Sequence, residues 1–154
     1  MSRVLLVGES NPYGADPRFA LYPEPPGCAG ARLCAILGMT DREYLRTFDR
    51  ANLCTLVFSL RSARFAAHRL TAEYRVLLGA RVTAAHGLDF VSFTVNQCAG
   101  CYSCQYQGHP HPWRAALILP HPSGRSRFWN APGAAERARR LVCDLVALAR
   151  SARG

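Results

Sequence analysis

The sequence predicts an α/β fold, a three-layer α/β/α sandwich around a central, mostly parallel four-stranded sheet. Four short runs are apolar almost throughout, as expected for strands that are covered on both faces. They are Val4–Val7, Leu53–Phe58, Tyr74–Leu78 and Ala116–Leu119. Helical patterns separate these runs, and such alternation favours parallel strands with helices on both sides. The length of 154 residues fits one domain with a real core, so we expect a single domain over 1–154.

The first half of the chain predicts two short helices after a long loop. The loop, Asn11–Gly30, is rich in Pro and Gly, and the helix Ala31–Gly38 follows it. A second helix begins after Thr40, whose hydroxyl can cap it while Glu43, three residues on, completes a capping box.

Further helices are expected in the second half. Ser62–Glu73 and Arg81–His86 have helical patterns, and Phe90–Val95 alternates weakly, as an additional strand would. A long final helix opens from Asn130, with Pro near its start. Its apolar stripe is expected to consist of Leu141, Leu145 and Leu148.

Composition and charge favour a globular protein that meets nucleic acid. Hydrophobic residues make up 49% and charged residues 19%, the balance of a folded domain. The net charge is +9, and all nineteen basic residues are Arg, whose guanidinium groups bind phosphate oxygens bidentately. Nucleic acid is the favoured partner and an anionic membrane surface the alternative. No apolar run is long enough to span a bilayer, and the start does not resemble a signal peptide, so we expect a cytoplasmic protein without a membrane partner.

The seven Cys fall into two groups. Cys28, Cys34, Cys54 and Cys143 stand in apolar surroundings and are expected to be small buried hydrophobes rather than disulfide partners.

The other three Cys lie at intervals of three in a segment, about 88–114, that we interpret as an insertion. Cys98, Cys101 and Cys104, with His109, form a workable tetrahedral set for structural zinc. An iron–sulfur cluster, with Cys28 or Cys34 as a further thiolate, is a second alternative, and free thiols are a third.

Polar and Gly-rich residues follow several of the predicted strands. Gly8-Glu9-Ser10-Asn11, Gly79 and His121-Pro122-Ser123 come directly after three of them. Ligands of open α/β sheets bind beyond the carboxyl ends of the strands, so we expect the functional site at this edge.

Five segments, in order, resemble the uracil-DNA glycosylase superfamily. The first is Gly8-Glu9-Ser10-Asn11-Pro12-Tyr13-Gly14, and the last is Pro120-His121-Pro122-Ser123-Gly124-Arg125. Between them, Gly27–Leu33, Ala51–Cys54 and Leu77–Val82 are similar to further segments of that family. The resemblance implies the family's fold and a monofunctional DNA glycosylase, which hydrolyses the N-glycosidic bond of uracil or a related pyrimidine and leaves an abasic site. It also implies DNA as partner and no cofactor for catalysis, and we expect a monomer.

Three residues carry the chemistry in this interpretation. His121 matches the donor that stabilises the leaving base, Asn52 the amide that reads the base edge, and Asn11 the group that positions water. An amide takes no proton at neutral pH, so Glu9, the nearby carboxylate, is an alternative general base. The structural alternatives are a loop histidine, an Asn bound to local backbone and an Asn-Pro turn.

Other residues are expected to shape the base site. Gly8 and Ser10 belong to the same loop as Asn11, and Tyr13 matches the ring that lies against the base C5 edge and excludes thymine. The family's uracil-specific branch has His where Gly14 stands here, which favours acceptance of larger C5 substituents. Tyr22 or Phe19 would stack on the base, with ordinary packing as the alternative.

The segment after His121 matches the loop that enters the minor groove in the family. The predicted DNA contacts are Ser123, Gly124, Arg125, Ser126 and Arg127. Phe128 or Trp129 can wedge the base stack, or Trp129 can anchor the final helix.

Three further functions compete with uracil excision. One is a glycosylase for a modified base, such as the C5-substituted bases of phage DNA, and another is a DNA-binding domain with weak turnover. A nucleotide-binding enzyme is disfavoured because the Gly8 loop lacks the Gly spacing of dinucleotide and P-loop sites.

Overall fold

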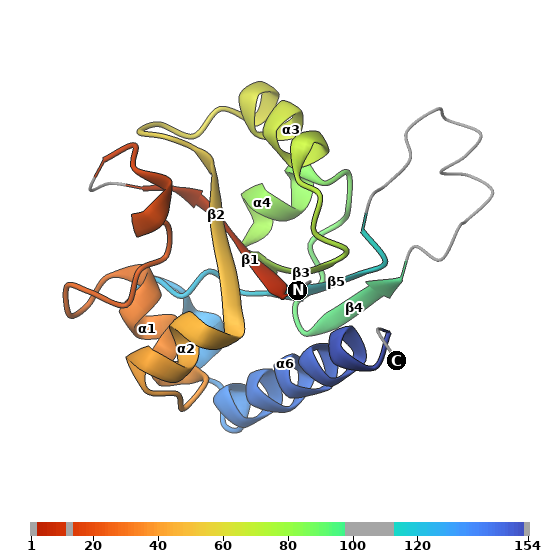
Figure 1. Cartoon of the computed structure of the whole chain (residues 1–154). Coiled ribbons are helices and arrows are strands. Elements are labelled where there is room, and N and C mark those ends of the chain that lie inside the picture. The colour runs from red at the N-terminus through yellow and green to blue at the C-terminus, as the bar shows by residue number, and fades with distance from the viewer. Residues whose placement is uncertain (1–2, 12–13, 98–112, 153–154) are drawn as a thin grey trace.

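Five strands form one mixed sheet in the order β2-β1-β3-β5-β4 (Figure 1). The computed structural model describes residues 3–11, 14–97 and 113–152. The strands are β1 (Val4–Ser10), β2 (Phe48–Cys54), β3 (Tyr74–Leu78), β4 (Thr94–Gln97) and β5 (Ala115–Leu119). Neighbours among β2, β1, β3 and β5 are parallel, and β4 runs antiparallel to β5. The α/β class is confirmed, but the sheet has five described strands rather than four.

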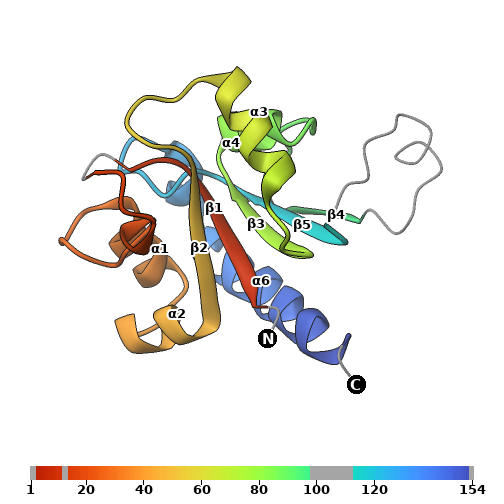
Figure 2. The same cartoon turned by 45° about the horizontal axis from the view of Figure 1, so that its top comes forward.

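Helices cover both faces of the sheet (Figures 1 and 2). The α-helices are α1 (Ala29–Ile36), α2 (Asp41–Thr47), α3 (Leu60–Arg69), α4 (Ala80–Ala85) and α6 (Ala134–Ser151). Two 3-10 turns, η1 (Pro17–Phe19) and η2 (Arg127–Asn130), lie in the loops. Helices α1, α2 and α6 share one core with the sheet, whereas α3 and α4 share another.

Strand alternation divides the two cores. Val4 and Leu6 of β1 belong to the core with α1, α2 and α6, and Leu5 and Val7 belong to the core with α3 and α4. By the same alternation, Gly8 and Ser10 continue toward the α1 side, while Glu9 continues toward the α4 side. This parity places Ser10 and Glu9 on opposite faces of the sheet.

The second strand was predicted about five residues too late. The expected strand Leu53–Phe58 is instead Phe48–Cys54, which pairs with β1 from Val4 onward. The strand β2 is at the edge of the sheet, where polar side chains are tolerated, so its sequence lacks the continuous apolar run of a central strand. The apolar residues after it, Leu56 and Val57, are exposed in a loop.

The additional strand is real, but it also lies later than its alternating pattern suggested. It spans Thr94–Gln97 rather than Phe90–Val95. β4 is an edge strand that pairs only with β5, and its inward residues are only half-buried. The alternation of apolar and polar residues in its sequence is therefore weak.

The final helix begins at Ala134 rather than Asn130, because Gly133 adopts a left-handed conformation and Arg127–Asn130 form a 3-10 turn. The predicted stripe is only partly correct, since Leu145 is buried but Leu148 is 42% exposed. Small residues bury against the sheet instead, which lets the helix approach closely. The buried positions are Ala134, Ala138, Val142, Leu145 and Ala149.

Two local predictions about side chains differ in outcome. The capping box is confirmed: the Glu43 amide donates to Thr40 Oγ1 at 3.2 Å, and the Thr40 amide donates to Glu43 Oε2 at 2.8 Å. Of the four scattered Cys, all free thiols, Cys34 is buried, but Cys143 is exposed and its burial was wrongly predicted.

Helix α3 ends at Arg69, four residues before the predicted Glu73, and the buried Arg75 lies against this helix end. The Arg75 guanidinium donates to the carbonyls of Ala67, Leu70 and Ala72 at 3.3, 2.8 and 2.9 Å. Its Nη1 also lies 3.2 Å from His86 Nε2. Burial lowers the pKa of Arg75 to about 10, so it stays charged at neutral pH and satisfies carbonyls that the helix end leaves open.

Within the described ranges, none of the helices combines the length and apolar character that crossing a membrane requires.

Candidate functional site

A pocket opens at the carboxyl end of β1 and β2, the edge where the sequence predicted the site. Its volume is about 90 Å³, several times the roughly 10–15 Å³ that one water needs, so it can hold a small ring. Five predicted substrate or catalytic residues line it: Ser10, Asn11, Phe19, Tyr22 and Asn52. Leu21, Glu24, Cys28, Ala29 and Gly30 complete the wall.

Asn52 contributes a buried polar atom to the wall of this pocket. Its Oδ1 is buried and accepts no hydrogen bond from any described residue. Gly8, paired with Asn52 in the parallel register, leaves room for this oxygen, and a Cβ at position 8 would collide with it. A buried acceptor without a donor costs about 1–3 kcal/mol.

The opposite wall is the backbone of Leu21 and Tyr22, held against the start of α1. Gly30 permits this approach, because a Cβ there would collide with both carbonyl oxygens. The buried Tyr44 hydroxyl donates to the Leu21 carbonyl at 2.9 Å, and Cys28 Sγ donates to the Tyr22 carbonyl at 3.3 Å. Leu21 has a φ of +49°, a strained conformation that these contacts sustain.

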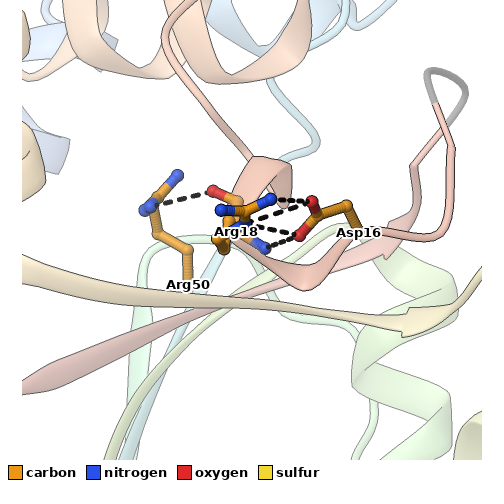
Figure 3. Close-up of polar contacts among 3 residues, drawn as sticks. All are labelled: Asp16, Arg18 and Arg50. Atoms are coloured by element: carbon orange, nitrogen blue, oxygen red, sulfur yellow. Dashed lines mark hydrogen bonds and ion pairs between the residues drawn. The ribbon is translucent and has the colours of Figure 1, made fainter.

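Arg50 of β2 binds the loop that contains Leu21 and Tyr22, a role that the sequence did not indicate (Figure 3). Its guanidinium donates to the carbonyls of Ala20 and Arg18 at 3.0 and 3.2 Å, and it lies 5.4 Å from the centre of the Tyr22 ring. Asp16 accepts hydrogen bonds from the Arg18 side chain and amide, which fixes the turn η1. These contacts hold the loop that carries the two predicted aromatic residues, Phe19 and Tyr22. Their rings meet edge to face, with the ring centres 5.5 Å apart.

His121 and Glu9 form a second group on the other side of β1. Both side chains lie against Gly79, whose φ of +97° and missing side chain leave space for them. Glu9 also pairs with Arg81 of α4 at 3.8 Å. Neither His121 nor Glu9 is among the residues that line the Asn11–Asn52 pocket, as the strand parity of Glu9 requires.

A hydrogen bond to the His121 ring determines which of its two nitrogens carries the proton. The Ser123 amide donates to His121 Nδ1 at 3.1 Å, so Nδ1 is an acceptor and a neutral ring carries its hydrogen on Nε2. Burial lowers the pKa of His121 below its usual 6.5, and the negative charge of Glu9 opposes this shift in part. At neutral pH His121 is therefore an uncharged ring with one N–H donor.

The predicted DNA loop lies beside this histidine and gains a further arginine. Ser123, Gly124, Arg125, Ser126 and Arg127 are at least partly accessible. The Arg32 guanidinium lies over Gly124, within 2.9 Å of where a Cβ would be, and it donates to the Gly27 carbonyl at 2.9 Å.

The indole of Trp129 ties this loop to the fold rather than projecting from it. Its Nε1 donates to the His121 carbonyl at 3.0 Å, and its ring meets Phe93 edge to face at 5.7 Å. Trp129 is thus an anchor, the alternative role that the sequence left open. Phe128 is exposed, with its ring edge to face against Phe90.

Several predicted site residues lie outside the described residues. They are Tyr13 and the candidate metal ligands Cys98, Cys101, Cys104 and His109. Within the described ranges no three His, Cys, Asp or Glu side chains form a group that could hold a metal ion. The zinc hypothesis therefore stays a prediction.

Comparison with protein-family models and with curated proteins found no match for this chain.

Proposed function

We propose that this protein is a monofunctional DNA glycosylase, similar to the uracil-DNA glycosylase superfamily, that removes uracil or a related pyrimidine. The observation that carries the proposal is Asn52 Oδ1, which is buried and accepts no hydrogen bond from the described residues, at a pocket of single-ring size. Uracil has an N–H between two carbonyl oxygens, so its edge supplies the donor that Asn52 lacks and accepts from the amide N–H₂. Cytosine has no hydrogen on that ring nitrogen, so only its exocyclic amino group can donate to Oδ1, and the base must then sit in a different register from uracil.

Base flipping would bring the target nucleotide into this edge. Extrusion costs a few kcal/mol, and stacking on Phe19 or Tyr22 recovers about 1–3 kcal/mol per base. Arg32, Arg125 and Arg127 supply phosphate contacts around the entrance.

Bond cleavage would use both groups of the edge. Strands lie about 4.8 Å apart, so the ends of β1 and β5, two strands apart, are separated by about 10 Å, a span that the bound nucleoside would have to bridge. The electrons of the N-glycosidic bond leave with the base, and the His121 Nε2–H donates to the base oxygen that becomes negative. Water held by Asn11 adds to the sugar carbon, and its proton ends on the released base, so no cofactor is consumed.

In this scheme the negative charge of Glu9 acts on the pKa of His121. Because Glu9 lies on the α4 side of β1 and pairs with Arg81, we assign it to the environment of His121 rather than to water activation.

A modified base is the second candidate substrate, favoured by a larger groove beside the pocket. This groove, of about 730 Å³, shares Phe19, Tyr22 and Glu24 with the pocket. Gly14 has open space where a side chain would stand. A pyrimidine with a bulky substituent would fit where the two volumes meet.

The test is alkali-induced cleavage of labelled DNA that carries one uracil, as a single strand and opposite G or A. We expect cleavage by the wild type and its loss in Asn52→Ala and Asn11→Ala. Parallel oligonucleotides with C5-substituted pyrimidines separate the two substrates. Tight DNA binding without cleavage of any of them would reject the glycosylase and favour a binding domain.

A further inference from the structure

The loop between β2 and α3 exposes apolar side chains at the functional edge. Val57 is 81% and Leu56 66% exposed, and Phe65 on the adjoining helix is 67% exposed. We call Leu56, Val57, Leu60 and Phe65 the 56–65 surface. These four exposed side chains lie within ten residues of the chain, and exposed apolar patches of large area mark interaction sites.

Three contacts fix this surface next to both groups of the site. The Asn11 amide donates to the Thr55 carbonyl at 3.1 Å, one residue before Leu56. Arg81 stacks over Phe58 at 5.5 Å while it pairs with Glu9. The loop accordingly arches beside the end of β1 in both views (Figures 1 and 2).

The charge around the 56–65 surface suits a polyanion. Arg61 and Arg64 are exposed on α3, and Arg69 lies over the Phe65 ring at 5.7 Å. The chain has no Asp or Glu between Arg50 and Ala72. Apolar tips flanked by arginine are the features by which proteins enter a base stack while holding its phosphates.

The loop after His121 is less suited to inserting an apolar side chain into a base stack. Its exposed tip is Gly124 and Arg125, Trp129 is engaged with the His121 carbonyl, and the Phe128 ring meets Phe90. The more exposed apolar side chains are therefore on the loop after Asn52, whereas Phe128 on the loop after His121 is 50% exposed and contacts Phe90.

We propose that Leu56 and Val57 are the wedge that fills the base stack of duplex DNA beside the flipped nucleotide, with Arg61 and Arg64 on the phosphates. The proposal rests on the proposed function in that DNA is the partner. A wedge acts only where a stack exists, so it assists excision from a duplex and is idle on a single strand.

The test compares Leu56→Ser/Val57→Ser with the control Val91→Ser/Leu148→Ser, whose native side chains are 55% and 42% exposed elsewhere. We expect kcat/KM on duplex uracil to fall at least about tenfold in the wedge variant and to stay within about twofold on single-stranded uracil. The control should match the wild type on both. Equal losses on both substrates, or none, would overturn the proposal.

A binding measurement separates this proposal from the proposed function. The probe is a duplex with a tetrahydrofuran abasic site flanked by 2-aminopurine, whose fluorescence rises on unstacking. A rise with wild type and control but not with the wedge variant supports the wedge even if no base is excised. An equal rise with all three overturns the wedge and leaves DNA as partner, and absence of DNA binding overturns both. Unchanged DNA readouts with loss of self-association would assign the surface to a second copy of the chain and also overturn the wedge.

Discussion

Replacing Asn52 with alanine should stabilise the fold while it removes base recognition. The side chain lies at the end of β2, and its buried Oδ1 accepts no hydrogen bond within the described part of the chain. Groups that serve only the fold are usually satisfied, whereas groups kept for a ligand are not. Stability and activity are therefore expected to change in opposite directions.

The magnitude follows from two opposing contributions. Relief of the unpaired acceptor favours the variant by about 1–3 kcal/mol. Loss of side-chain contacts, on the scale of one methylene, disfavours it by about 0.8 kcal/mol. The net gain is about 1 kcal/mol, which raises Tm by about 2–4 °C for a chain of this length.

Thermal and urea unfolding of wild type, Asn52→Ala and a matched control would measure this effect. The control is Thr83→Ala, since the buried Thr83 Oγ1 donates to the Gly79 carbonyl at 2.8 Å and its loss should cost about 1 kcal/mol. If Asn52→Ala were destabilised as much as the control, the amide would be a structural group and the argument for a ligand would fail.

Four other predictions concern the site and the fold around it. Because the pKa of His121 lies below its usual 6.5, excision should be constant at neutral pH and fall only below 6.5, and folding should weaken there too, since the unfolded chain takes the proton first. Glu9→Gln removes the charge that raises this pKa, so the acidic limb of the pH–rate profile should move to lower pH; a move upward would refute the assignment. Arg50→Ala frees the loop that carries Tyr22 and should weaken binding of uracil DNA about tenfold in a titration, whereas unchanged binding would mean that the loop holds itself. Arg75→Met removes the guanidinium that donates to three carbonyls and should cost about 3 kcal/mol or more in urea unfolding, and a loss under 1 kcal/mol would contradict its capping role.

The central strands were predictable because they are buried on both faces. Tyr74–Leu78 was predicted with its observed bounds, and Ala116–Leu119 was one residue short at its start. Phe48–Cys54 could not be recognised in the same way, because an edge strand keeps Asp49, Arg50 and Asn52 among its residues. Burial produces the pattern that sequence reasoning detects, so accuracy falls where burial does.

The site was predictable as a set of residues but not as an arrangement. Asn11 and Asn52 were expected together and do share a pocket, whereas His121 and Glu9 form a separate group beside Gly79. Strand parity turns Glu9 to the α4 side of β1, and His121 follows β5, two strands from β1 in the sheet. Strand order and register, which a single sequence does not specify, therefore set this separation. The positioning roles of Arg50 and Arg32 involve partners far away in the chain and leave no local signal.

The most direct test of the account is single-turnover excision of uracil by the wild type and His121→Ala, with release of free base as the readout. Removal of one donor to the leaving base should lower the rate about 10²–10³-fold while DNA affinity stays near that of the wild type. Free uracil released equally fast by the variant would contradict the role of His121. Its absence with the wild type, on single-stranded and duplex DNA alike, would contradict uracil excision itself.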